Sequence, residues 1–347
     1  MIILGIETSC DETAVSVVEA EGGLNDLKFK LLGSAVNSQI EIHKPYGGVF
    51  PTLAKREHIK NLPLVLEQAL KEADLKNGLK NIDLITVTVG PGLEPALWTG
   101  INFAEELGKK WNIPIIPANH MEGHMTSVLF SNEKIKFPAI ALLISGGHTE
   151  LIFLKSWIDK EKIGETLDDA VGEAFDKVAR MLGLPYPGGP EISRLAEEAR
   201  TKNIQLETKF PRPMIYSKNF NFSFSGLKTA VLYYIKKMET LKEKQKMEIA
   251  REFEDAVIET LISKTKAAIE KYLPKTLIIG GGVIANKALR ENFLKLKESY
   301  PEMEILIPEK SLTTDNATMI AAAGYIEFLK GKKLSKELRA DGNLDIN

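Results

Sequence analysis

Short apolar runs separated by polar turns recur along the first third of the chain. Their spacing predicts strands at 2–7, 13–19 and 29–36, a helix at 54–73, a strand at 84–89, a helix at 95–111 and a strand at 113–117. A polar turn at residues 8–12 joins the first two strands, which predicts an antiparallel pair. Pro63 lies inside the first predicted helix and should kink or interrupt it, because proline lacks the backbone N–H.

The same order of predicted strands, turns and helices begins again in the second half of the chain. Predicted strands at 139–144 and 150–154 flank a glycine-containing turn, and a later strand at 276–279 ends in Gly280-Gly281-Gly282 before a helix that opens near Asn286. Two such starts predict a duplicated α/β lobe. The predicted division is a first lobe at 1–135 plus 315–347, a second lobe at 136–314, a boundary near 131–137, and a helical insertion at about 165–272.

Composition narrows the class of protein. The single cysteine, Cys10, excludes an internal disulfide and fits a reducing cytoplasm. The first residues lack a basic segment and soon meet Glu7 and Asp11, which argues against a secretory signal. No apolar run approaches the roughly 20 residues of a membrane span. The formal net charge of -2 gives no general attraction to nucleic acid, so a polyanion would need a local basic surface or a partner.

Two of the five histidines stand four residues apart, in His120-Met121-Glu122-Gly123-His124. On a helix this spacing places both imidazoles on one face, which predicts half of a metal site. A zinc peptidase would need H-E-x-x-H, whereas Glu122 lies about 200° around the helix from His120. The pattern therefore favours a metal and disfavours a protease. A buried histidine pair without a metal is the alternative.

Acidic residues supply a third ligand. Asp315 stands at a predicted helix start, where the helix dipole alone would stabilise a carboxylate. Combined with His120 and His124, it completes a set of two histidines and one carboxylate that leaves positions open for substrate. Such a set suits a divalent transition metal, iron(II) as first choice or zinc. Asp11, in the first turn, could act on a substrate or simply stabilise the turn.

Four glycine-rich turns follow predicted strands or precede helices. They are Gly90-Pro91-Gly92, Ser145-Gly146-Gly147, Pro187-Gly188-Gly189-Pro190 and Gly280-Gly281-Gly282. Glycine allows a ligand to approach the backbone closely, and a following helix N-terminus presents N–H groups to an anion. Together the turns predict a nucleotide-like ligand, although tight turns alone would explain each one. Neither a Walker A loop nor G-x-G-x-x-G is present.

From Thr208 to Met238 the chain contains no acidic residue. It carries the cations Lys209, Arg212, Lys218, Lys228, Lys236 and Lys237, interleaved with the aromatics Phe210, Tyr216, Phe220, Phe222, Phe224, Tyr233 and Tyr234. Cations for phosphates and rings for bases are typical of surfaces that bind single-stranded RNA. A hydrophobic core with a solvated lysine face explains the pattern equally well.

Eight motifs, in order, resemble the bacterial form of the TsaD family of tRNA threonylcarbamoyltransferases over about residues 1–330. They are Gly-Ile-Glu-Thr-Ser-Cys-Asp-Glu-Thr at 5–13, His-Met-Glu-Gly-His at 120–124, Ser-Gly-Gly-His-Thr at 145–149, Gly-Glu-Ala-Phe-Asp-Lys at 172–177, Pro-Gly-Gly-Pro at 187–190, Phe-Ser-Phe-Ser-Gly-Leu-Lys-Thr at 222–229, Gly-Gly-Val-Ile-Ala-Asn at 281–286 and Thr-Asp-Asn at 314–316. The resemblance implies the duplicated ribonuclease-H-like lobes of the sugar-kinase, Hsp70 and actin superfamily. It also implies transfer of threonylcarbamoyl from threonylcarbamoyl-AMP to N6 of the tRNA adenosine 3′-adjacent to the anticodon.

The resemblance also implies roles for individual residues. It implies metal ligation by His120, His124 and Asp315, catalytic help from Asp11 and His148, and substrate binding by Leu143, Ile144, Ser145, Gly146, Gly147, Asp176, Gly189 and Asn286. Its implied partners are tRNA, a separate synthase that supplies the adenylate, and homologues of TsaB and TsaE. The chain departs from the family pattern P-G-L-x-G-A-L at residues 91–97, where Pro95 replaces the flexible glycine and Glu94 adds charge.

Two other functions fit the same fold. A small-molecule kinase would use ATP and magnesium and would gain nothing from a His-x3-His pair. A non-catalytic ATP-binding scaffold would need no metal ligands. Bound iron or zinc would discriminate against the kinase, and turnover of an adenylate would discriminate against the scaffold.

Overall fold

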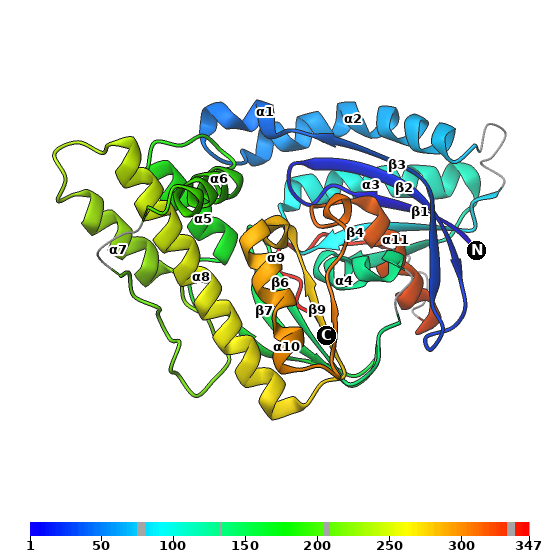
Figure 1. Ribbon diagram of the computed structural model, residues 1–347. Coiled ribbons are helices and arrows are strands. Elements are labelled where there is room, and N and C mark those ends of the chain that lie inside the picture. Colours follow the sequence, from blue (N-terminus) through cyan, green and yellow to red (C-terminus); the bar gives the residue numbers. More distant parts are fainter. Residues whose placement is uncertain (75–80, 132–133, 205–208, 332–336, 347) are drawn as a thin grey trace. The chain divides into compact units, whose positions relative to one another are not determined.

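A computed structural model of the chain describes residues 1–74, 81–131, 134–204, 209–331 and 337–346. These residues form two compact units: unit 1 comprises Met1–Ile135 and Pro308–Asn347, and unit 2 comprises Lys136–Ile307 (Figure 1). Residues 308–314, which the sequence analysis placed in the second lobe, therefore belong to unit 1. The last strand of unit 2 ends at Leu306, and the segment after it leads into a helix of unit 1. Parts of the predicted boundary and of the C-terminal tail lie outside the described residues.

Unit 1 is built on a five-stranded sheet with the order β3-β2-β1-β4-β5. Its strands are β1 (Ile2–Glu7), β2 (Glu12–Glu21), β3 (Lys28–Ser38), β4 (Leu84–Gly90) and β5 (Ile115–Asn119). The first three are antiparallel neighbours, whereas β4 and β5 run parallel to β1. All five predicted strands are confirmed, with small shifts at their ends. Because β1, β4 and β5 are parallel, Glu7, Gly90 and Asn119 end their strands at the same edge of the sheet.

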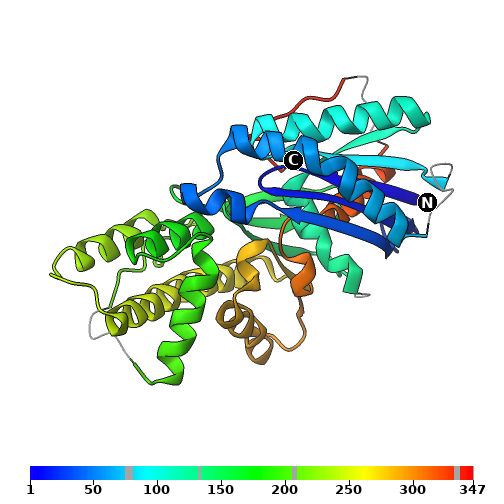
Figure 2. The ribbon, with the colours of Figure 1, turned by 90° about the horizontal axis from the view of Figure 1, so that it is seen from above.

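Helices cover both faces of this sheet, so its central strands are apolar on both sides. α2 (Pro51–Glu72) and α3 (Glu94–Trp111) pack on one face, and α11 (Ala317–Leu329) packs on the other (Figures 1 and 2). The close approach of α11 depends on Gly5, where a Cβ would lie only 2.2 Å from the carbonyl oxygen of Ala317. This contact sets the start of α11 against β1 and brings the segment that contains Asp315 to the sheet.

The helix predicted at 54–73 is longer than expected and is not interrupted by Pro63. α2 runs without a break from Pro51 to Glu72. Pro63 lies on the exposed side of the helix, while Leu62 and Val65 pack into the core. The loss of one backbone hydrogen bond is offset by burial of the apolar face. In α3, Glu94 and Pro95 occupy the first turn, a position that proline tolerates.

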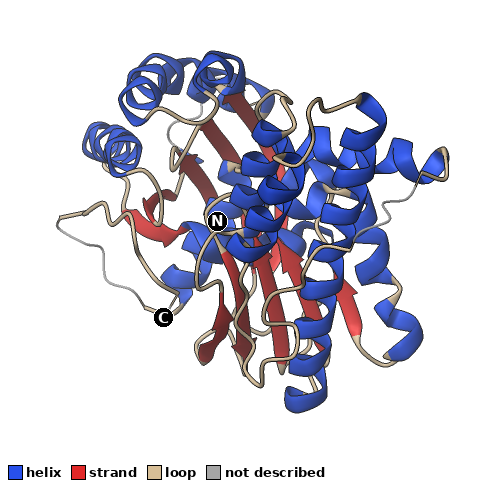
Figure 3. Ribbon diagram, turned by 90° about the vertical axis from the view of Figure 1, so that its left-hand side faces the viewer, coloured by secondary structure: helices blue, strands red, loops and turns tan. Residues whose placement is uncertain are grey.

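Unit 2 repeats the sheet of unit 1, with the order β10-β9-β6-β7-β8. Its strands are β6 (Ala139–Ile144), β7 (Thr149–Leu154), β8 (Lys160–Glu165), β9 (Thr276–Gly280) and β10 (Glu304–Leu306). Three antiparallel strands are followed by two strands parallel to the first, as in unit 1 (Figure 3, strands in red). The predicted duplication is confirmed.

Between β8 and β9 the chain of unit 2 is helical. The helices are α5 (Val171–Met181), α6 (Gly188–Thr201), α7 (Ser225–Ile235) and α8 (Glu243–Tyr272). Phe175, Phe222, Phe224 and Phe253 are fully buried among them and belong to the core that these helices share with the sheet. After β9 follow η4 (Gly282–Ala285), α9 (Lys287–Leu294) and α10 (Leu296–Ser299). None of the described helices combines the length and apolar content that crossing a membrane requires.

Candidate functional site

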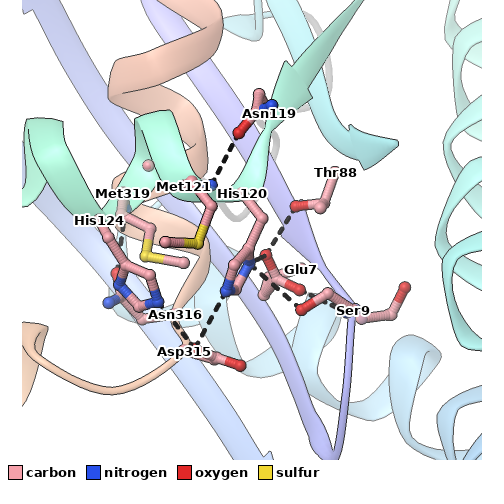
Figure 4. Close-up of polar contacts among 12 residues, drawn as sticks. Glu7, Ser9, Thr88, Asn119, His120, Met121, His124, Asp315, Asn316 and Met319 are labelled. Atoms are coloured by element: carbon pink, nitrogen blue, oxygen red, sulfur yellow. Dashed lines mark hydrogen bonds and ion pairs between the residues drawn. The ribbon is translucent and has the colours of Figure 1, made fainter. Parts of the chain in front are cut away.

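The paired histidines lie on α4 (His120–Thr126), which begins directly after β5. The side chain of Asn119 starts this helix, since its Oδ1 accepts hydrogen bonds from the backbone N–H groups of Met121 at 2.8 Å and Glu122 at 3.2 Å. The predicted helical spacing is confirmed. Both rings are buried, and their centroids are 4.6 Å apart in a nearly perpendicular arrangement (Figure 4). The two imidazoles therefore share one face of the helix.

Asp315 comes to the histidines from the other end of the chain. α11 begins at Ala317 rather than at residue 315, and Asn316 caps it by accepting from the N–H of Met319 at 2.9 Å. Asp315 therefore precedes the helix, with its Oδ1 3.3 Å from the Nε2 atoms of both His120 and His124 (Figure 4). One ligand atom from each of the three residues lies within 4.8 Å of the others. The three predicted ligands meet within unit 1.

The donor set fits a metal ion. His124 is fully buried, and neither of its ring nitrogens makes a hydrogen bond, although Nε2 is within ion-pair distance of Asp315. A buried nitrogen without a hydrogen bond is costly, and a cation bound between the three side chains would remove that cost for Nε2. Two imidazoles and one carboxylate form a set used for divalent transition metals. Burial is the main cause that lowers the pKa of His124, which favours the neutral, metal-binding ring.

Glu7, at the end of β1, lies next to the ring of His120 (Figure 4). Its carboxylate is fully buried and accepts from His120 Nδ1 at 3.0 Å, from Thr88 Oγ1 at 2.6 Å and from the backbone N–H of Ser9. Burial opposes ionisation of Glu7, but His120 outweighs it and lowers the pKa of the carboxyl group. Burial likewise opposes protonation of His120, but Asp315 and Glu7 raise the pKa of its ring well above the usual value. Sequence reasoning missed Glu7 as a separate functional residue, although an acid ending an apolar strand was a possible signal.

Glu122 contributes no ligand atom to the histidine site. Among the described residues, the group able to hold a metal contains only His120, His124 and Asp315. Glu122 is buried on the same helix. The arrangement of a zinc peptidase, in which a glutamate faces the metal-bound water, is therefore not formed by the H-M-E-G-H segment.

The first turn of unit 1 carries Asp11, which is 6% exposed, and Glu12, which opens β2. Burial, followed by the nearby charges of Asp11 and Asp315, raises the pKa of Glu12 well above its usual value. The backbone carbonyl of Asp11 accepts from the N–H of Gln39 at 2.9 Å. His148, the other predicted catalytic residue, belongs to unit 2, where its N–H donates to Ser145 Oγ at 3.1 Å. Catalytic roles for Asp11 and His148 remain predictions.

The predicted substrate loop of unit 2 divides into two parts. Leu143 and Ile144 are fully buried residues of β6, so their side chains belong to the core. Ser145 and Gly147 lie in the turn between β6 and β7, where Ser145 is half-buried and Gly147 is exposed. Any ligand contact from this loop would therefore come from the turn and its backbone.

Four glycines in the glycine-rich turns of unit 2 face open space. A Cβ added at any of them would meet no atom of the other described residues within 4 Å; they are Gly146, Gly147, Gly189 and Gly282. Two neighbouring glycines are needed by the fold instead. A Cβ at Gly188 would lie 2.4 Å from that of Ala179, and Gly281, at φ +96, would bring one within 2.3 Å of the Ile144 carbonyl oxygen. The turns thus combine glycines that pack closely with glycines that leave the backbone accessible.

Asp176 and Asn286 stabilise two of these turns through hydrogen bonds to the backbone. Asp176 Oδ1 accepts from the N–H of Gly188 at 2.7 Å, at the start of α6. Asn286 caps α9 by accepting from the N–H of Leu289 at 2.9 Å, while its Nδ2 donates to Glu254 Oε1 at 2.5 Å. Glu254 also accepts from Arg200 Nη1 at 2.5 Å. Burial raises the pKa of Glu254 despite these partners, so Asn286 is oriented by a buried carboxyl group that sequence reasoning missed.

The acid-free stretch resolves into core and surface, apart from Thr208, which lies outside the described residues. Its four phenylalanines are buried, whereas Tyr216 is 96% and Tyr233 61% exposed. Lys228 pairs with Asp169 at 2.5 Å, and Arg212 pairs with Glu252 and Glu259 of α8. The core explanation is therefore correct for the phenylalanines. Exposed cations remain at Lys209, Lys218, Lys236 and Lys237.

The fold shows the structural class of the protein. The two lobes repeat one strand order, which is the duplicated fold expected of the sugar-kinase, Hsp70 and actin superfamily. The crystal structure of HypF from T. kodakarensis has the same fold, with a TM-score of 0.56 and 12% identity. The match covers 95% of this chain and 48% of that chain.

The family follows from comparison of whole sequences. The family model of TsaD, tRNA N6-adenosine threonylcarbamoyltransferase, matches residues 30–322. The enzyme of that name from Thermosipho africanus is 46% identical over 100% of both chains, and the one from Thermosipho melanesiensis is 48% identical over 100% of this chain and 97% of its own. The chain belongs to the TsaD family and is a transferase. These relatives do not favour the kinase or the ATP-binding scaffold.

Proposed function

We propose that this transferase moves the threonylcarbamoyl group of threonylcarbamoyl-AMP to N6 of the tRNA adenosine 3′-adjacent to the anticodon. The observation that carries this proposal is the meeting of His120, His124 and Asp315 in a chain of this family. The substrate is a mixed anhydride and is already activated. The enzyme must therefore hold it, shield it from water and present it to the adenine amine.

We propose that His120, His124 and Asp315 hold one divalent metal, iron(II) in preference to zinc. The choice of iron(II) rests on the two-histidine, one-carboxylate set, which leaves coordination positions open. When bound, the metal supplies Lewis-acid stabilisation of negative charge that develops on a substrate oxygen. Glu7 would hold the ring of His120 with Nδ1 protonated and Nε2 directed to the metal.

In unit 2 we propose that the glycine-rich turns bind the adenylate. The accessible backbone at Gly146, Gly147 and Gly189 would donate N–H groups to the phosphate. Asp176 would fix the turn that contains Gly189, and Asn286 would contact the adenosine part from the start of α9. The side chains of Leu143 and Ile144 would support the loop from the core.

Deprotonation of the adenine amine requires a base. Asp11 is our candidate in unit 1, since it is nearly buried in the turn that follows Glu7. His148 is the second candidate, in the turn of unit 2. We also propose that the protein works in the cytoplasm with homologues of TsaB and TsaE and receives its adenylate from a separate synthase.

The test is a reconstituted reaction of the purified protein, the synthase product and unmodified tRNA, with and without the partner proteins. Mass spectrometry of the digested tRNA should detect threonylcarbamoyladenosine. Metal analysis should find about one transition metal per chain, which the double variant His120→Ala with His124→Ala should lose. The Glu122→Gln variant is the matched control and should retain it. Absence of the modified base under all conditions would refute the reaction, and full metal retention by the double variant would refute the site.

A further inference from the structure

A second group of buried histidines lies in unit 1, outside the metal ligands. His43 and His58 are fully buried and flank Gln39, which is also fully buried. His43 is on α1 (Ile40–His43) and His58 is on α2. The polar atoms of these three side chains are connected to each other and to the turn that carries Asp11. Their hydrogen bonds determine which ring nitrogens carry the protons.

The proton of His43 is fixed by a backbone group. The N–H of Phe50, just before α2, donates to His43 Nδ1 at 3.3 Å. A backbone N–H can only donate, so Nδ1 must be unprotonated. A neutral His43 then carries its proton on Nε2, which lies 3.2 Å from Gln39 Oε1 and donates to it.

The orientation of Gln39 is fixed independently. Its Nε2 lies 3.4 Å from the carbonyl oxygen of Ala54, which can only accept. The amide nitrogen must therefore face Ala54, and the amide oxygen must face His43. The same nitrogen is 3.3 Å from His58 Nδ1 and donates to it.

His58 connects this chain of hydrogen bonds to the turn that carries Asp11. Its Nδ1 accepts from Gln39 and also from Thr13 Oγ1 at 2.8 Å, so the ring proton is on Nε2. From there it donates to the backbone carbonyl of Cys10 at 3.1 Å. The next carbonyl, that of Asp11, accepts from the N–H of Gln39. Two successive carbonyls of the turn are thus held, that of Cys10 by the side chain of His58 and that of Asp11 by the backbone of Gln39.

We infer that Gln39, His43 and His58 are positioning residues, which hold the backbone of Cys10 and Asp11 through a chain of hydrogen bonds that is complete only when both imidazoles are neutral. The inference rests on the proposed role of Asp11. Burial is the main cause that lowers the pKa values of both rings, in agreement with neutral histidines. The charges that oppose this are Glu7 and Asp11 near His58, and Asp11 and Glu57 near His43.

The first test needs no substitution. Nitrogen-15 NMR of the histidine side chains distinguishes the two neutral tautomers from the imidazolium. At neutral pH His43 and His58 should both be neutral with the proton on Nε2. An Nδ1–H tautomer or an imidazolium at His58 would overturn the inference.

The second test measures turnover in the reconstituted tRNA modification reaction. The amide nitrogen of His58→Gln can take the place of Nε2 and donate to Cys10, whereas that of His58→Asn is too short to do so. His58→Asn should lower kcat by roughly 10-fold to 100-fold with an unchanged KM for tRNA and unchanged metal content, and His58→Gln should retain most of the turnover. Equal losses, or no loss, in the two variants would contradict positioning of Cys10 by His58.

If the His58→Asn variant does not fold, the Gln39→Glu variant tests the same network. A carboxylate cannot donate to Ala54 or His58, so it should draw a proton onto His58 Nδ1, visible by NMR, and lower kcat. Gln68→Glu, at an exposed position of α2, is the matched control. Asp11→Asn separates the two proposals. Full activity of Asp11→Asn would refute the role of Asp11, whereas inactive Asp11→Asn with fully active His58→Asn would refute only the positioning network.

Discussion

The carboxylate of Glu7 and the imidazole of His120 are joined by a hydrogen bond of 3.0 Å between Oε2 and Nδ1. The bond holds the ring proton on Nδ1 and leaves Nε2 directed at Asp315. Thr88 and the backbone of Ser9 donate to the same carboxylate, so Glu7 cannot turn away from His120 without breaking other bonds. The end of β1 therefore orients a side chain that lies more than a hundred residues later in the chain.

Removal of the Glu7 carboxylate should weaken metal binding. We expect Glu7→Ala to lower metal affinity about 10-fold to 100-fold, the usual effect of losing a group that orients a metal-bound histidine. Competition with a chelator of known affinity measures this without an activity assay. Glu67→Gln, an exposed substitution on α2, should leave the affinity unchanged. An unchanged affinity in Glu7→Ala would show that His120 is held by other contacts.

Neighbouring glycines of one turn should respond in opposite ways to alanine. At Gly188 the new Cβ would lie 2.4 Å from that of Ala179, so Gly188→Ala should destabilise unit 2 by about 1–3 kcal/mol. At Gly189 the Cβ meets open space, so Gly189→Ala should keep the stability of the wild type but weaken binding of an adenylate analogue.

Thermal unfolding and calorimetric titration of the two variants distinguish these effects. Equal loss of binding without loss of stability in both would mean that Gly188, too, faces the ligand. Unchanged binding in Gly189→Ala would remove this turn from the proposed adenylate site.

The sequence alone predicts those strands and helices that depend on a local pattern of apolar and polar residues. Periods of two and of 3.6 residues locate the strands of the unit 1 sheet, the strands β6, β7 and β9 of the unit 2 sheet, and the helical spacing of His120 and His124. They do not locate β8 or β10, which were not predicted. Pro63 shows the limit of such rules, since packing of Leu62 and Val65 outweighs one missing hydrogen bond. A local rule gives the cost of proline but not the burial that offsets it.

Other features depend on contacts between distant segments. Glu7 meets His120 only because β1, β4 and β5 end at the same edge of the sheet. Gly188 and Gly189 are identical in sequence, but the first packs against Ala179 and the second faces open space. Only the packing of the folded chain distinguishes them. The aromatics of the acid-free stretch likewise looked uniform, yet Phe222 is fully buried and Tyr216 is almost fully exposed.

Acid should destabilise unit 1 through His43 and His58. In the folded protein the pKa values of both rings lie below the usual histidine value of 6.5, chiefly because of burial. The unfolded chain therefore binds more protons than the folded chain as the pH falls below about 6.5, and stability is lost on acidification. Urea unfolding at pH 7.5 and pH 5.5 should show a smaller pH effect in His58→Gln than in the wild type. Identical pH effects in both proteins would contradict a neutral, buried His58.

The exposed lysines of the acid-free stretch test whether this surface binds tRNA. Lys218, Lys236 and Lys237 are exposed, and Tyr216 and Tyr233 are exposed on the same stretch. If the lysines contact phosphates, each lost contact should reduce the slope of log affinity against log salt by about 1. The triple change to alanine should then weaken tRNA binding and leave adenylate binding intact.

A matched triple variant of unit 1, at the exposed residues Lys28, Lys30 and Lys71, removes the same charge from another surface. Both variants should be titrated with tRNA at several salt concentrations, with the partner proteins present, because the near-neutral chain offers little general attraction to RNA. Loss of affinity and slope in the unit 2 variant alone would locate the tRNA contact on the acid-free stretch. Equal effects in the two variants would reflect only the change in net charge, and no effect in either would leave these lysines as a solvated face over the buried phenylalanines.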